Sequence, residues 1–139
     1  MMKIYNKLFP LNGFLAMTIW PFMFIRKEYR HQYNAVDENH ETIHACQQVE
    51  FLVTLLAIMT GLCLTCISWW WMVAVPFGYF LWYGIEYVVR YFVYGDAKEA
   101  YRNISFEQEA FLNERNFNYL VERMYFAWIK YLTKKTYRR

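Results

Sequence analysis

Two histidines and a glutamate stand close together in the segment His40-Glu41-Thr42-Ile43-His44. On a helix, residues four apart lie on the same face one turn apart, so both imidazoles can reach a single metal ion. Glu41 directly follows the first histidine, where its carboxylate can take a proton from the attacking water. The segment therefore predicts a zinc site with His40 and His44 as ligands and Glu41 as general base. The alternative interpretation is a pair of surface histidines at a membrane edge.

A catalytic zinc site usually has three protein ligands, and this motif supplies only two of them. The candidates for the third ligand are Glu107 and Glu109, which fall near the start of an expected helix. Acidic residues also favour helix N-termini for electrostatic reasons alone. Two side chains at this spacing point about 200° apart on a helix, so at most one of them should face the histidines.

The elements that must position these residues are rich in apolar side chains. Hydrophobic residues make up 58% of the 139-residue chain and aromatic residues 22%, yet the mean hydropathy is only +0.01. The apolar residues are therefore unevenly distributed, and the 35 residues from Phe51 to Ile85 include no Asp, Glu, Lys, Arg or His. Such a run is typical of membrane-spanning helices. The remaining chain is too short to bury it. We expect a single membrane-embedded domain over 1–139, with membrane lipid as a partner.

The length of this run indicates a hairpin. As one continuous helix it would measure about 52 Å, whereas the hydrocarbon layer is about 30 Å thick. Pro10, Gly13 and Pro21 interrupt an earlier apolar run, which indicates an anchor or a re-entrant helix there. The expected fold class is all-α, with an anchor or re-entrant helix over 8–25, a motif-bearing helix over 36–67, a return helix over 72–94 and an amphipathic helix over 106–132.

Other metal and catalytic chemistries fit the sequence less well. Cys63 and Cys66 form a CxxC inside the apolar run, but no second pair accompanies them, so packing between helices is the simpler interpretation. A di-iron site needs two ExxH motifs, and only Glu41 to His44 supplies one. Phosphate-binding loops and nucleic-acid motifs are lacking, so nucleic acid is not an expected partner. Conceivable groups to stabilise an oxyanion are His31, Tyr101 and Arg102.

The combination of HExxH with a later Glu107-Gln108-Glu109-Ala110 segment resembles the gluzincin metallopeptidases. The resemblance is closest to their integral-membrane branches, of the CAAX prenyl protease and antirepressor-sensor types. In the prenyl protease type the third zinc ligand begins a Glu-x-x-Ala-Asp string. The resemblance therefore implies Glu107 as the third ligand, with Glu109 as the fallback. Phe111 stands where that string has its Asp.

A second resemblance covers most of the chain. It is to a group of small bacterial membrane proteins that share HExxHxxQQ, Tyr-Gly-x-Glu-Tyr/Trp-x-x-Arg and Ala-Tyr-x-Asn-Ile-Ser-Phe-Glu-x-Glu-Ala. These patterns occur here over 40–48, 83–90 and 100–110. The first pattern includes Gln47 and Gln48, which we expect to support the metal ligands. This resemblance implies no particular activity.

The favoured function is a zinc-dependent membrane metallopeptidase that hydrolyses a peptide or protein substrate. The alternative is a non-catalytic membrane protein that keeps the motif for metal binding or structure, because the chain leaves little room for a substrate cleft. Ten of the fifteen Lys and Arg residues follow position 86. The positive-inside rule then predicts a bacterial inner-membrane protein with the motif on the cytoplasmic side. The basic run over 130–139 would add attraction to anionic lipid.

Overall fold

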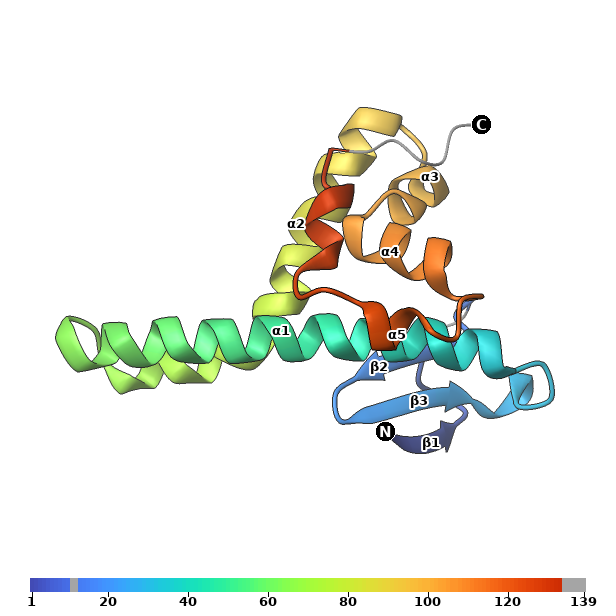
Figure 1. Cartoon of the computed structure of the whole chain (residues 1–139), viewed down its shortest axis with the longest axis horizontal. Coiled ribbons are helices and arrows are strands. Elements are labelled where there is room, and N and C mark those ends of the chain that lie inside the picture. Colours follow the sequence, from blue (N-terminus) through green and yellow to red (C-terminus); the bar gives the residue numbers. More distant parts are fainter. Residues whose placement is uncertain (11–12, 134–139) are drawn as a thin grey trace.

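The computed structural model describes residues 1–10 and 13–133, so most of the basic run at the C-terminus lies outside the described residues. It combines a small β-sheet with a set of helices (Figure 1). The longest element is α1 (Ala35–Thr65), and its first half lies between the sheet and a cluster of helices. The fold is therefore mixed, and the expected all-α class is wrong.

The N-terminal segment forms strands where a helix over 8–25 was expected. Side chains at alternate positions are buried, Ala16 and Thr18 on one strand and Met23 and Ile25 on another, which is the two-residue period of a half-buried sheet. The strand order is β1-β3-β2, with β1 parallel and β2 antiparallel to β3. The strands are β1 (Met2–Asn6), β2 (Ala16–Ile19) and β3 (Phe22–Arg26), followed by a short 3-10 helix, η1 (Lys27–Tyr29).

Helix α1 begins at a capping box. The Asn34 side chain accepts hydrogen bonds from the backbone of Val36 and Asp37, and the Asp37 carboxylate accepts one from the backbone N–H of Asn34. Burial then divides the helix in two. Polar and charged side chains are buried as far as Glu50, whereas apolar side chains from Val53 onward are mostly exposed. One rigid element thus carries both the HExxH motif and the start of the apolar hairpin.

The return arm, expected as one helix over 72–94, consists of two helical segments that meet at a bend. A 3-10 helix, η2 (Trp69–Phe77), runs back along α1, and α2 (Gly78–Tyr94) then leaves at a steep angle (Figure 1). At the bend a Cβ on Gly78 would lie 2.0 Å from Leu55 Cδ1, so the absence of a side chain permits the close contact with α1. By length and composition, Ala35–Thr65 and Trp69–Tyr94 are both apolar enough to cross a membrane.

The C-terminal part is also broken where one amphipathic helix over 106–132 was expected. It consists of α3 (Ala97–Arg102), α4 (Ser105–Asn113), α5 (Tyr119–Glu122) and a 3-10 helix, η3 (Ala127–Tyr131). The start of α4 is held by α2, because the Glu86 carboxylate accepts hydrogen bonds from both the backbone N–H and the hydroxyl of Ser105. Arg90, one turn further along α2, pairs with Glu86. The contact between Glu86 and Ser105 thus joins α4 to α2, and α4 lies above the first half of α1 (Figure 1).

Candidate metal centre

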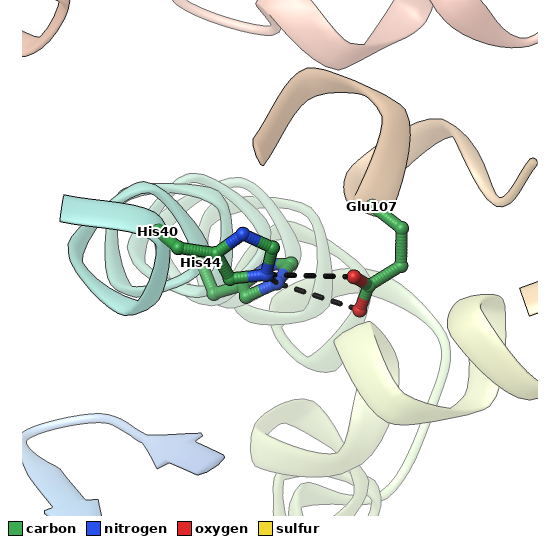
Figure 2. Close-up of side chains that lie close together, drawn as sticks. All are labelled: His40, His44 and Glu107. Carbon is green, nitrogen blue, oxygen red and sulfur yellow. Dashed lines mark hydrogen bonds and ion pairs between the residues drawn. The ribbon is translucent and has the colours of Figure 1, made fainter. Parts of the chain in front are cut away.

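Three potential metal ligands converge between α1 and α4 (Figure 2). His40 and His44 project from α1 and Glu107 from the first turn of α4, and all three side chains are largely buried. Their ligand atoms lie within 4.8 Å of one another. The two Nε2 atoms are 3.1 Å apart, and each lies close to a different Glu107 oxygen, at 3.5 Å for His40 and 3.4 Å for His44. The group could hold a metal ion.

The outer nitrogens of the two imidazoles are held by hydrogen-bond acceptors. His40 Nδ1 lies 2.9 Å from a Glu114 carboxylate oxygen, and His44 Nδ1 lies 2.8 Å from the Gln47 amide oxygen. Because both partners accept, each Nδ1 carries a proton, and Nε2 is the atom of each ring that faces Glu107. Burial alone would lower the pKa of His40, but hydrogen bonds to Glu107 and Glu114 raise it to about 10, so a metal ion would take the place of an imidazole proton at Nε2.

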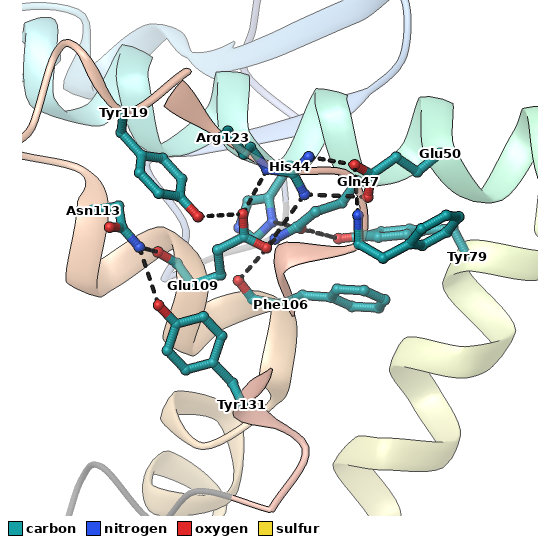
Figure 3. A network of polar contacts seen from close by, with 11 residues as sticks. His44, Gln47, Glu50, Tyr79, Phe106, Glu109, Asn113, Tyr119, Arg123 and Tyr131 are labelled. Carbon is teal, nitrogen blue, oxygen red and sulfur yellow. Dashed lines mark hydrogen bonds and ion pairs between the residues drawn. The ribbon is translucent and has the colours of Figure 1, made fainter. Parts of the chain in front are cut away.

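Gln47 is itself fixed by contacts on its other side. Its amide nitrogen donates to the Phe106 carbonyl at 3.2 Å and to a Glu109 oxygen at 3.1 Å (Figure 3). These two acceptors determine which end of the amide faces His44. Gln47 therefore contacts a proposed ligand directly.

Gln48, also expected to support the ligands, contacts strand β2 instead. Its amide donates to the Thr18 carbonyl and accepts from the Trp20 N–H, both at 2.8 Å. It thus docks the sheet against α1.

Glu107 is a buried carboxylate with one unsatisfied oxygen. Oε1 accepts a hydrogen bond from the Tyr83 hydroxyl at 2.8 Å, whereas Oε2 has no hydrogen-bond partner among the described residues. Burial alone would raise the pKa of Glu107, but the imidazoles of His44 and His40 outweigh it and hold that pKa well below its usual range. A buried, charged and partly unpaired carboxylate is costly. A cation placed among the three side chains would remove that cost, so the residues fit a metal ion.

Glu109, the fallback ligand, points away from this group. Its carboxylate accepts hydrogen bonds from the Tyr119 hydroxyl at 2.9 Å and from Arg123 Nε at 2.6 Å (Figure 3). Arg123 also pairs with Glu50 of α1. Glu109 thus belongs to a buried charge network that ties the C-terminal segment to α1, and the structure places Glu107 alone of the two against the histidines.

Glu41 faces a cavity of about 620 Å³ on the side of α1 that carries the histidines. Its Oε2 accepts a hydrogen bond from the Thr18 hydroxyl at 2.7 Å, so strand β2 orients the expected general base. Of the three groups considered for an oxyanion, Tyr101 lines this cavity, and His31 and Arg102 are not among the described residues that do. Burial, and then the Glu107 charge, raise the pKa of Tyr101, which therefore stays a hydroxyl donor.

Sequence reasoning missed Thr18, Tyr83 and Glu114, which contact residues of this centre. Thr18 was hidden because its segment was interpreted as a helix. Glu114 could have been found from its spacing, since it follows Glu107 by two helical turns and therefore lies on the same face of α4.

No protein-family model, curated protein or solved structure matches this chain. Any function assigned to it therefore rests on the geometry of the centre.

Proposed function

We propose that this chain is a zinc-dependent peptidase held at a membrane, with His40, His44 and Glu107 as the metal ligands and Glu41 as the general base. The observation that carries the proposal is the buried Glu107 carboxylate, whose Oε2 has no hydrogen-bond partner among the described residues. The Nε2 atoms of two imidazoles converge on it in the wall of the cavity that also holds Glu41.

The donor set supports zinc. Two imidazoles and one carboxylate are a ligand set used by catalytic zinc sites, which keep a further position open. When bound, zinc would polarise the scissile carbonyl and make a water molecule acidic enough to lose a proton near neutral pH. Glu41, held by Thr18, would accept that proton and return it to the leaving amine. Tyr101 would donate its hydroxyl hydrogen to the oxygen on which negative charge develops.

The edge of β2 that faces away from β3 supports a peptide as the substrate. The Thr18 carbonyl and the Trp20 N–H bond to Gln48, so they point away from β3. Alternate residues of a strand direct their backbone groups to the same edge, so the N–H and C=O of Ala16 also point away from β3. Ala16, Met17 and Thr18 all line the cavity. Gln48 already binds the Thr18 carbonyl and the Trp20 N–H, so an extended peptide would add at the Ala16 end of this edge by main-chain hydrogen bonds.

We further propose that the protein resides in a bacterial inner membrane with the metal centre on the cytoplasmic side. The support is the exposed apolar hairpin and the ten of fifteen Lys and Arg residues that follow position 86. Membrane lipid and a peptide or protein substrate are the proposed partners.

The test replaces the base and the ligands separately. With one equivalent of zinc, Glu41→Gln should retain the metal and lose about 10²- to 10⁴-fold in hydrolysis of a fluorogenic peptide library, because an amide cannot accept the proton. His44→Ala should lose metal and activity together. Glu122→Gln, at an exposed position, is the matched control. Zinc binding without any Glu41-dependent hydrolysis would overturn the peptidase and leave a non-catalytic metal-binding protein.

A further inference from the structure

The hairpin formed by the second half of α1 and by η2 projects beyond the rest of the molecule (Figure 1). Its apolar side chains are open to the surroundings, and eight of them are between 52% and 84% exposed: Val53, Ile58, Leu64, Trp69, Trp70, Trp71, Val73 and Phe77. They lie on different sides of the two arms. A helix that is apolar on all sides is usually buried in a protein core or in a membrane. No described part of the chain encloses this hairpin.

Helix α2 presents a second apolar surface. Leu81, Ile85, Val88 and Phe92 are exposed and recur at helical spacing, so they share one face. Other residues of α2, Phe80, Tyr83 and Tyr87, line the metal cavity. In Figure 1 the cluster containing α3 and α4 lies on the side of α2 away from the hairpin, and the angle between α2 and the hairpin is open.

Aromatic side chains surround the base of the hairpin. Trp20 lines a small cavity together with Leu52 and Pro76. It also lines a larger one on the other side of α1 with Tyr125 and Phe126. All three aromatic residues are exposed, Tyr125 by 86%. Trp and Tyr at such a place are typical of the headgroup level of a membrane.

We propose that a lipid bilayer fills the angle between the hairpin and α2, so that the hairpin dips into the hydrocarbon while α2 lies along the membrane surface. From Phe51 to Thr65 the hairpin is about 22 Å deep, less than the hydrocarbon thickness of about 30 Å. The bend at Gly78 turns α2 away from α1. Only the short η2 therefore runs back along α1, and α2 does not cross the bilayer beside it. A flat lipid surface matches the apolar hairpin, the apolar face of α2, and the aromatic residues Trp20, Tyr125 and Phe126 where the two meet.

This orientation also sets the height of the metal centre. Helix α2 separates the lipid from the cavity, and a helix with its side chains is about 10 Å across. The cavity therefore lies about one helix diameter above the membrane surface. The orientation itself does not depend on the proposed peptidase activity.

The experiment measures the depth of single nitroxide labels in phosphatidylcholine–phosphatidylglycerol vesicles. A background of Cys46→Ser, Cys63→Ala and Cys66→Ala removes the native thiols, which are all free. Single cysteines then replace hairpin residues Val53 and Leu64 and α2 residues Ile85 and Phe92. Glu28→Cys, on the exposed η1, is the water-exposed reference. Depth comes from power saturation with oxygen and a nickel complex, and circular dichroism checks the fold of each variant.

The expected result is a depth increase of about 16 Å from position 53 to position 64, with positions 85 and 92 at nearly equal, shallow depth. An increase of about 10 Å between positions 85 and 92 would show that α2 crosses the bilayer and would overturn the proposal. Hairpin labels that are shielded from both oxygen and nickel would mean that a second copy of the chain covers them. That outcome, or failure to bind vesicles, would also overturn it.

Discussion

Glu114 should strengthen metal binding through His40, although it does not touch the metal position. Its carboxylate accepts the Nδ1 proton of His40 at 2.9 Å and is 22% exposed. Glu114→Gln keeps an acceptor of the same length but loses the charge. A charge-assisted hydrogen bond contributes about 1 to 1.5 kcal/mol more than a neutral one, so zinc should bind about 5- to 13-fold more weakly. Glu114→Ala removes the acceptor and should cost about 10- to 100-fold.

The assay is a competition titration of zinc against a chromophoric chelator in detergent at neutral pH. Glu122→Gln removes an equal charge from an exposed position on α5 and serves as the control. The order of affinities should be wild type and control together, then Glu114→Gln, then Glu114→Ala. Wild-type affinity in Glu114→Ala would refute the reasoning, as would an equal loss in the control.

Four further outcomes follow from the same geometry. Glu107→Gln should lose most of its zinc by elemental analysis, whereas Glu109→Gln should keep it; equal retention would remove Glu107 from the site. Glu109→Gln should instead lower the free energy of unfolding by about 3 kcal/mol, seen as a lower Tm, because Arg123 loses a buried partner. Thr18→Val should reduce hydrolysis about tenfold at unchanged zinc content, since it removes the hydrogen bond to Glu41; an unchanged rate would make that contact structural only. On acidification the lowered pKa keeps Glu107 ionised, and hydrogen bonds to Glu107 and Glu114 outweigh burial and raise the pKa of His40 to about 10, so zinc must displace an imidazole proton and its affinity should fall with decreasing pH; an affinity independent of pH between 7 and 5 would contradict this ligand set.

The pair of histidines in the candidate metal centre was predictable because its decisive geometry is local. The spacing of His40 and His44 fixes their relation on any helix. The choice of Glu107 over Glu109 came from a resemblance, whereas the structure explains it by Arg123, which holds Glu109 on the other side of α4. That ion pair joins distant segments, so residue spacing alone could not reveal it.

The sheet could not be predicted with the same rules. Each strand has only four or five residues, too few for a two-residue period to stand out from a generally apolar run. The pairing of β1 with β3 is non-local. The break in the C-terminal segment is also tertiary in origin. Phe126 adopts a left-handed backbone with φ of 56°, and its N–H donates to Glu50 of α1 at 3.1 Å, a partner 76 positions away.

Gln48 also protects the molecule from association through its sheet. Strand β2 lies at one edge, and an open edge invites pairing with a strand of another chain, which is a common start of aggregation. The Gln48 amide donates to the Thr18 carbonyl and accepts from the Trp20 N–H, and these are the hydrogen bonds that a neighbouring strand would make. The part of the edge nearest the β2–β3 turn is therefore already satisfied. A foreign strand would have to displace the Gln48 side chain before it could pair there.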